Sequence, residues 1–90
     1  MNPRTTTWCK ICGVTSLEDA LAAAKSGVDA IGFNFFGASP RYIDPSGAAE
    51  ICVELQSRHP EVKRIGLFVN ALPSSVKQVL SQVSLNILQF

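Results

Sequence analysis

Apolar and polar positions along the chain predict strands and helices in alternation. A short β-prone run over residues 7–11 is followed by a helical pattern that starts near Thr15 and stops at Gly27. Thr15 and Glu18 have the spacing of a capping box, in which each side chain satisfies a free backbone N–H at the helix start. The apolar face expected for this helix comprises Leu17, Leu21 and Ala24.

A second strand and a second helix follow. The run DAIGFNFF, residues 29–36, is too short for a helix and rich in aromatic residues, so we expect a strand that ends in a turn-prone loop. Asp44 is a good N-cap because Pro45 suits the first helical position, and the helix should run from Pro45 to about Arg58. Its expected buried residues are Ala48, Ile51, Cys52 and Leu55.

The last third of the chain repeats this pattern. KRIGLFVN, residues 63–70, predicts a third strand, and LNILQF, residues 85–90, predicts the start of a fourth. A helix is expected between them, with a buried stripe of Pro73, Val76, Val79, Leu80 and Val83. The order βαβαβαβ leaves room for a helix in every connection, which implies parallel strands joined by right-handed crossovers. No linker divides residues 1–90, so we expect one domain.

Two architectures suit this order: an open doubly wound sheet and part of a (β/α)8 barrel. The chain length of 90 residues favours the first, because a complete barrel usually needs at least about 200 residues. Against the first, the turn CGVTSLED lacks both the G-x-G-x-x-G fingerprint and the P-loop pattern. The pattern of elements alone leaves both architectures open.

Composition and charge narrow the class of function. Eight basic and seven acidic residues give a net charge of +1, so nucleic-acid binding has no electrostatic footprint. No apolar stretch reaches the roughly 18 residues that span a bilayer, and the first residues lack the apolar core of a secretory signal. Three cysteines, an odd number, agree with a reducing compartment. We therefore expect a cytoplasmic chain without nucleic-acid or membrane partners.

Cys9 and Cys12 are the first residues that could carry chemistry. A closed zinc site needs four ligands, and the remaining candidates are only Cys52, within a helical stripe, and His59, at that helix's end. A redox pair is also disfavoured, because residues three apart on a strand point to opposite faces; Cys9 is expected to be a packing residue. Cys12 lies where parallel strands exit, on the same face as Lys10, and could act as base or nucleophile. Its alternative is a small buried hydrophobe, which is what we expect of Cys52.

Arg41 is the second candidate, in the loop GASPRYI after the second strand. A guanidinium suits bidentate recognition of a carboxylate or phosphate, and this loop can reach over the same edge of the sheet as Cys12. The alternative is a solvated loop arginine. Asn34 and Asn70 could line the same edge, or each could satisfy turn backbone.

The motifs KICGVTSLEDALAAAKSGVDAIGFNF, SPRYI and IGLFVN, in this order, together resemble the phosphoribosylanthranilate isomerase family over about residues 8–90. The resemblance implies a (β/α)8 TIM barrel of roughly twice this length, of which these residues form the first half. It also implies an Amadori rearrangement of N-(5'-phosphoribosyl)anthranilate in tryptophan biosynthesis, without a cofactor or metal. By position, Cys12 matches the family's general base, and Arg41 matches a residue that contacts the anthranilate part of the substrate.

The sequence departs from the family pattern after LQF, where the family continues into a QLHG-like motif. The family's general acid and phosphate-binding loops belong to the half that is not present, so the 90-residue chain alone is expected to be inactive. Two alternatives are a half-barrel module, which self-associates or pairs with a complementary chain, and a thiol redox module using Cys9 and Cys12.

Overall fold

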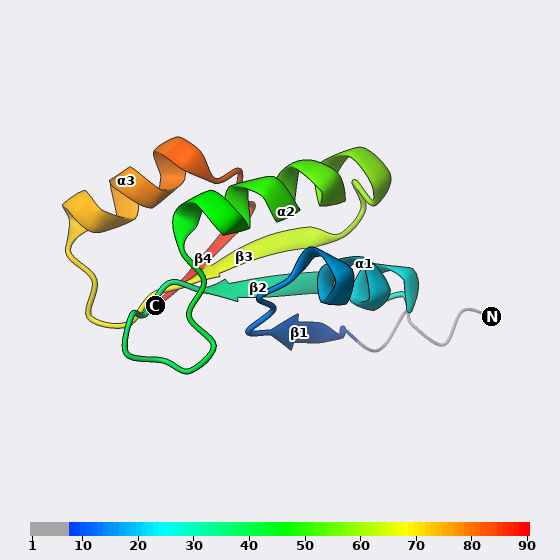
Figure 1. Ribbon diagram of the computed structural model, residues 1–90, viewed down its shortest axis with the longest axis horizontal. Coiled ribbons are helices and arrows are strands. Elements are labelled where there is room, and N and C mark those ends of the chain that lie inside the picture. The colour runs from blue at the N-terminus through cyan, green and yellow to red at the C-terminus, as the bar shows by residue number, and fades with distance from the viewer. Residues whose placement is uncertain (1–7) are drawn as a thin grey trace.

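The computed structural model describes residues 8–90 of the chain. Strands and helices alternate in the predicted order βαβαβαβ (Figure 1). The elements are β1 (Lys10–Cys12), α1 (Leu17–Lys25), β2 (Ala30–Asn34), α2 (Pro45–Arg58), β3 (Lys63–Leu67), α3 (Pro73–Gln82) and β4 (Ile87–Gln89). Within residues 8–90, no helix combines the length and apolar character that crossing a membrane requires.

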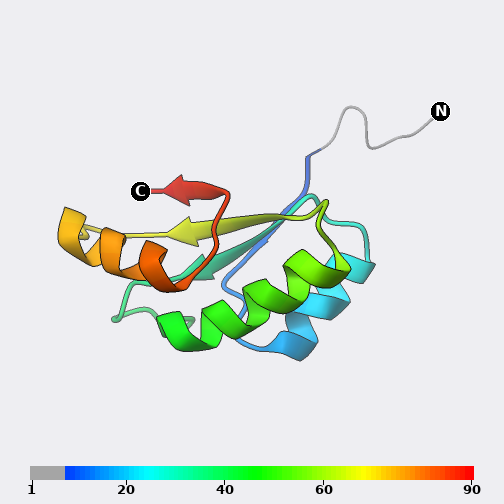
Figure 2. The same ribbon diagram turned by 90° about the horizontal axis from the view of Figure 1, so that it is seen from above.

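The four strands form one parallel sheet in the order β1-β2-β3-β4. Figures 1 and 2 show that α1, α2 and α3 all lie on one side of this sheet. Each crossover therefore returns the chain on the same side of the sheet. This is the arrangement of a barrel wall, whereas a doubly wound sheet has helices on both sides. The helix-covered face holds the core, and within residues 8–90 no helix or strand covers the opposite face, called the open face below (Figure 2).

The core lies between the sheet and the three helices. Side chains alternate across β2, so that Ile31 and Phe33, both 0% exposed, face the helices while Gly32 faces the open side. The four residues predicted to be buried in α2 are all confirmed: Ala48, Ile51, Cys52 and Leu55. The bounds of α2 and its N-cap are also confirmed, because Asp44 Oδ1 accepts a hydrogen bond of 2.8 Å from the Gly47 N–H.

The start of α1 differs from the prediction by one residue. Ser16, not Thr15, is the N-cap, and its Oγ accepts a hydrogen bond of 3.1 Å from the Asp19 N–H. The apolar face is also shifted: Leu17 is 39% exposed and Leu21 is half-buried. The residues of α1 that are buried are the small ones, Ala20, Ala23 and Ala24. Small side chains let α1 approach β2 and α2 closely, and this close packing decided which face was buried.

Two residues of the predicted stripe in α3 are wrong. Val76, Val79 and Val83 are buried as predicted, but Pro73 is exposed and Leu80 is 41% exposed. Pro73 is the first residue of α3, a position that suits proline whether or not its side chain is buried. Adjacent positions of a helix differ by about 100° in direction, so Leu80 turns away from the face that Val79 presents to the core.

Cys9 is not the strand-packing residue that the sequence suggested. It precedes β1 and is exposed, and its backbone is occupied instead: the Cys9 N–H donates to Asp29 Oδ2 at 2.7 Å, and its carbonyl accepts from Asp29 and Ala30 N–H groups. The ladder between β1 and β2 starts only at Lys10, so Cys9 lies outside the pleat that would direct its side chain into a core. Thr7, the start of the predicted strand, lies outside the described residues.

The sheet curls toward its open face. Lys10 Nζ on β1 donates a hydrogen bond of 2.9 Å to Gln89 Oε1 on β4, although these are the two outer strands of the sheet. In a flat sheet, three steps of roughly 4.8 Å would separate those strands by about 14 Å. A contact between their side chains therefore indicates the strong curvature that a barrel wall requires.

Candidate active site

Cys12 is the last residue of β1, at the edge of the sheet where all the strands end. Its side chain is half-buried, and its register partner on β2 is Gly32. A Cβ added at Gly32 would lie 3.0 Å from Cys12 Sγ, so the glycine leaves the space that the thiol occupies. Lys10 lies two residues earlier on the same face and places a positive charge there.

Arg41 lies beside the residue that follows Cys12. A Cβ added at Gly13 would be 2.6 Å from Arg41 Cδ, 3.3 Å from its Cβ and 3.4 Å from its Nη1. The arginine side chain therefore extends along the bare backbone of Gly13, and its charged end stays solvent-accessible because the residue as a whole is exposed. The structure thus places Arg41 against the residue next to Cys12, although the two candidates are 29 positions apart in the chain.

The backbone of Gly13 has a conformation that permits this arrangement. Its φ is +80°, a region that favours glycine, and its N–H donates to the Gly32 carbonyl at 3.0 Å. This turn ends β1 immediately after Cys12 and directs the chain toward α1. Gly13 is therefore required twice, for the turn and for the contact with Arg41.

The two asparagines differ in what they do. Asn34 closes β2 and uses its side chain within the following loop, where Oδ1 accepts from the Phe36 N–H at 2.9 Å and Nδ2 donates to Ser39 Oγ at 3.2 Å. Asn70 follows β3 in a left-handed conformation with φ of 50°, which asparagine tolerates better than most residues. Both positions thus match the turn-forming alternative that the sequence left open.

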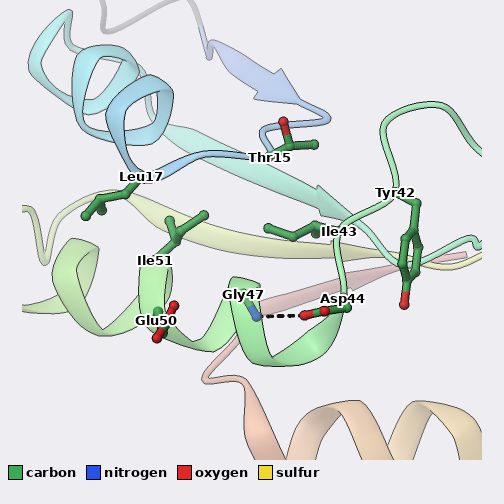
Figure 3. A pocket seen from close by; sticks show the side chains of 8 residues that line it. All are labelled: Thr15, Leu17, Tyr42, Ile43, Asp44, Gly47, Glu50 and Ile51. Carbon is green, nitrogen blue, oxygen red and sulfur yellow. Dashed lines mark hydrogen bonds between the residues drawn. The ribbon is translucent and has the colours of Figure 1, made fainter.

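A cavity of about 480 Å³ opens near this edge, between the segment after β1 and the first turns of α2 (Figure 3). Asp44 on its wall is engaged as the helix cap, and the Gly47 N–H and the Ser46 hydroxyl hold the pKa of its carboxyl below the ordinary value. Cys12 and Arg41 do not line this cavity, so it adds no group to theirs. Its lining residues are Thr15, Leu17, Tyr42, Ile43, Asp44, Gly47, Glu50 and Ile51.

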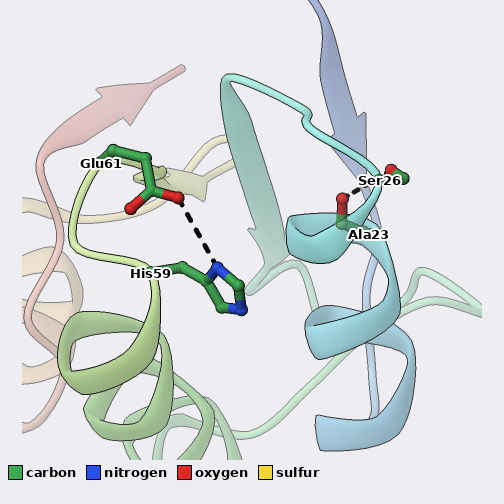
Figure 4. A network of polar contacts seen from close by, with 4 residues as sticks. All are labelled: Ala23, Ser26, His59 and Glu61. Atoms are coloured by element: carbon green, nitrogen blue, oxygen red, sulfur yellow. Dashed lines mark hydrogen bonds and ion pairs between the residues drawn. The ribbon is translucent and has the colours of Figure 1, made fainter.

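The opposite edge of the sheet, where the helices end, carries structural contacts. His59 caps the C-terminus of α2, as predicted for a helix-end residue, and its Nδ1 lies 3.6 Å from Glu61 Oε2 (Figure 4). At the end of α1, the Ser26 hydroxyl donates to the Ala23 carbonyl at 2.7 Å (Figure 4). No three His, Cys, Asp or Glu side chains within residues 8–90 come together in a way that could hold a metal ion.

Cys52 is the third thiol, and it lies in the core under α2 with 1% of its surface exposed. Burial raises its pKa to about 11, and the positive charge of Arg64 opposes this only in part. A thiol that stays protonated in an apolar core is inert, as expected for this residue. All three cysteines are free.

Four residues of this edge were not found from the sequence: Gly13, Gly32, Ser39 and Gln89. Gly13 carried a usable signal, because a glycine directly after a strand often marks a turn with positive φ. Ser39 carried a weaker one, because Ser-Pro favours the start of a turn. Gly32 and Gln89 carried none. The role of Gly32 depends on the register of β1 against β2, and that of Gln89 depends on the curl of the sheet.

A curled parallel sheet with helices on its outer side, and with its reactive side chains at the carboxyl ends of the strands, is the wall of a (β/α)8-barrel enzyme. Residues 9–90 match the model of one family, N-(5'-phosphoribosyl)anthranilate (PRA) isomerase. The chain therefore belongs to the phosphoribosylanthranilate isomerase family, as its motifs suggested.

Similar proteins agree on both sequence and fold. The N-(5'-phosphoribosyl)anthranilate isomerase of Hahella chejuensis is 49% identical over 82 residues, which are 91% of this chain and 37% of that protein. The crystal structure of phosphoribosyl anthranilate isomerase from Thermotoga maritima matches with a TM-score of 0.83 and 49% identity, covering 90% of this chain and 38% of that one.

A second solved structure is of a phosphoribosyl anthranilate isomerase in complex with reduced 1-(o-carboxyphenylamino)-1-deoxyribulose 5-phosphate. It also matches with a TM-score of 0.83 and 49% identity, covering 90% of this chain and 40% of that one. The chain thus spans well under half the length of the relatives that it matches.

Proposed function

We propose that this chain supplies the general base and an anthranilate-contacting residue to a phosphoribosylanthranilate isomerase. Cys12 is the base and Arg41 contacts the anthranilate part of the substrate. The observation that carries the proposal is the placement of Arg41 against Gly13, directly beside Cys12, at the carboxyl edge of a parallel sheet. Support comes from a 49% identical isomerase that has been crystallised with a phosphosugar carrying a carboxyphenylamino group.

The chemistry fits the residues present. When the furanose ring opens, the C1'–O4' bond breaks, the substrate nitrogen forms a C=N bond to C1', and O4' takes up a proton. A base then removes the C2' proton, and the electron pair of that C–H bond forms C1'=C2' while the C=N electrons return to nitrogen. The Cys12 sulfur accepts this second proton, a step for which a positioned base contributes about 10²- to 10⁴-fold.

Arg41 has the geometry for the other task. A guanidinium donates two parallel hydrogen bonds to a carboxylate, and the anthranilate ring carries one. Holding that end of the substrate beside Cys12 would fix the distance between the sulfur and C2', which is the kind of positioning that lowers the barrier of a proton transfer. No cofactor takes part in this scheme. The proposal also places the chain in the cytoplasm, because the isomerase is a biosynthetic enzyme.

The proposal also includes a requirement for groups beyond this chain. Protonation of O4' needs a general acid and the phosphate needs an anchor, and neither is assigned to any residue of the 90. The open face and the unpaired edges of β1 and β4 are where further strands would complete a barrel. We therefore expect the 90-residue chain to be inactive alone and to gain activity with a complementary half-barrel.

Complementation tests this directly. The chain is assayed for conversion of N-(5'-phosphoribosyl)anthranilate by chromatography, alone and with the part of the Hahella chejuensis isomerase that lies beyond the matched region. We expect turnover only in the mixture, and Cys12→Ala should lower it by about 10²-fold or more. Cys9→Ala is the matched control and should leave turnover unchanged, because Cys9 lies before β1. Turnover by the chain alone within tenfold of the complete isomerase, or full activity of C12A in the mixture, would overturn the proposal.

A further inference from the structure

Arg41 belongs to an exposed loop, yet its side chain has a defined place. The β2–α2 loop, residues 35–44, joins β2 to α2 at the carboxyl edge of the sheet. Arginine side chains lose up to about 2 kcal/mol of rotamer entropy when they are ordered, so an exposed arginine does not stay on a glycine backbone without support. The source of that support lies within the loop.

The ends of the loop are fastened to each other. Asn34 and Tyr42 form an isolated parallel bridge, and the Ile43 N–H donates to the Asn34 carbonyl at 3.0 Å. Tyr42, the residue after Arg41, is thereby held at the end of β2. Pro40, the residue before Arg41, lies within a turn that is closed by a hydrogen bond of 3.1 Å from the Tyr42 N–H to the Ser39 carbonyl. This leaves little freedom for the backbone of Arg41.

The Ser39 hydroxyl connects the strand end to Arg41 itself. Ser39 Oγ accepts two hydrogen bonds, one of 3.2 Å from Asn34 Nδ2 and one of 3.1 Å from the Arg41 N–H. A hydroxyl has two acceptor lone pairs, so both bonds can form together. The orientation of the Asn34 amide is determined by its other bond, because the Phe36 N–H can only donate and therefore must face Oδ1.

From these contacts we infer that Asn34 and Ser39 are positioning residues, which hold the Arg41 guanidinium over Gly13 and beside Cys12. The inference rests on the proposed function for the substrate that Arg41 meets, but not for the position of the side chain. A hydrogen-bonded chain leads from the end of β2 through Asn34 and Ser39 to the backbone of Arg41, and the rigid sheet thereby sets where the charge is presented. Both residues act through Arg41 and have no role in the proton transfer itself.

Nuclear magnetic resonance of the isotope-labelled 90-residue chain can measure the position of Arg41. In the unaltered chain, nuclear Overhauser contacts should connect the Arg41 Hδ protons with the Gly13 Hα protons, because the two carbons are in van der Waals contact. Ser39→Ala removes the acceptor of both hydrogen bonds, and Asn34→Ala breaks the same connection from the other side. Both variants should weaken these contacts at least threefold, whereas Ser39→Thr, which keeps the hydroxyl, should restore them.

Ser46→Ala is the matched control. The Ser46 hydroxyl also donates to a nearby polar side chain, Asp44, and is outside the hydrogen bonds that lead from Asn34 through Ser39 to Arg41. It should leave the Arg41 to Gly13 contacts unchanged. Contacts between β2 and β3 report whether each variant keeps its fold, so loss of the loop contacts alone can be separated from general unfolding.

A second measurement uses anthranilate as the probe. Titration of the Arg41 Nε–H resonance with anthranilate should give a dissociation constant that rises fivefold or more in Ser39→Ala and stays within twofold in Ser39→Thr and Ser46→Ala. Arg41→Ala should abolish the anthranilate response of neighbouring resonances. If it does not, the proposed role of Arg41 fails while the positioning inference stands on the Overhauser contacts. If Ser39→Ala and Asn34→Ala both keep those contacts at full strength, the positioning inference is overturned, whatever anthranilate does.

Discussion

The contact between Gly13 and Arg41 predicts a specific effect of adding one methyl group. Gly13→Ala places a Cβ at a residue with φ of +80° and 2.6 Å from Arg41 Cδ, far inside van der Waals contact. Gly27→Ala provides the matched control, because Gly27 has φ of +95° and nothing within 4 Å of its added Cβ. The two substitutions therefore share backbone strain, and only one of them collides with the arginine.

The size of the effect follows from the backbone strain and from the collision with Arg41. An alanine held in a left-handed conformation costs roughly 1–2 kcal/mol, so both variants should lose about this much free energy of unfolding. In a domain of this size, 1 kcal/mol lowers Tm by about 4–8 °C. The collision in Gly13→Ala adds little to this loss, because Arg41 is exposed and can rotate away. Its main effect should be positional, with the guanidinium displaced from the side of Cys12.

Urea denaturation followed by circular dichroism measures the loss of unfolding free energy. The rate at which Arg41 reacts with phenylglyoxal measures the displacement of its guanidinium. Both variants should shift the urea midpoint similarly. Only Gly13→Ala should raise the rate of modification at Arg41, read by peptide mass spectrometry against Arg58 as an internal standard, since Arg58 is bound to Glu54 on α2 at 3.0 Å. Equal Arg41 rates in the two variants would refute the reasoning that Gly13 is required for the arginine.

Three further predictions concern the core, a helix cap and the buried thiol. Leu55→Ala, at a residue 0% exposed, should cost about 2–5 kcal/mol in urea unfolding. Val53→Ala, 64% exposed on the same helix, should change the free energy by no more than about 0.5 kcal/mol, and equal losses would contradict the packing described. Because the pKa of Asp44 lies below 3.8 in the folded chain, its stabilisation should be present above that pH and be lost as the pH falls through the lowered value. Asp44→Ala should flatten this part of the Tm-against-pH curve, and an unchanged curve would show that the Asp44 helix cap does not cause this pH dependence. For Cys52, iodoacetamide at pH 8 should label it far more slowly than Cys9, and 8 M urea, roughly enough to unfold a small domain, should remove the difference. Its raised pKa should also make the fold lose stability as the pH rises from 9.0 through about 11, an effect absent from Cys52→Ala.

Much of the fold could be predicted from local pattern. The order of the elements, the bounds of α2 and its four buried residues followed from hydrophobic spacing and from the Asp44–Pro45 helix start. These signals are local, because a cap and an apolar stripe act within one or two turns of chain. The errors at Leu17 and Leu80 have one cause: neighbouring elements decide how close a helix lies and which edge of its stripe is covered.

The candidate site divides in the same way. Cys12 and Arg41 were singled out because the first ends a strand and the second follows one, and strand exits share one edge in a parallel sheet. The placement of Arg41 next to Cys12 could not be predicted from the sequence. It depends on Gly13 having no side chain and on the turn that Gly13 makes with φ of +80°. The place of Cys9 was likewise decided by where the β1–β2 ladder begins.

By itself, then, the sequence determined the alternation of strands and helices, the family and the types of side chain at the strand exits, because periodicity, capping and motif are written in neighbouring residues. Only the tertiary structure decided the curl that lets Lys10 reach Gln89, the packing of Arg41 on Gly13, and the bonds from Asn34 through Ser39. The first two are contacts between segments that meet only when the sheet has formed, so register and curvature place their atoms. The bonds of Asn34 and Ser39 span at most five residues, and the structure decided which of the polar groups in that loop are paired.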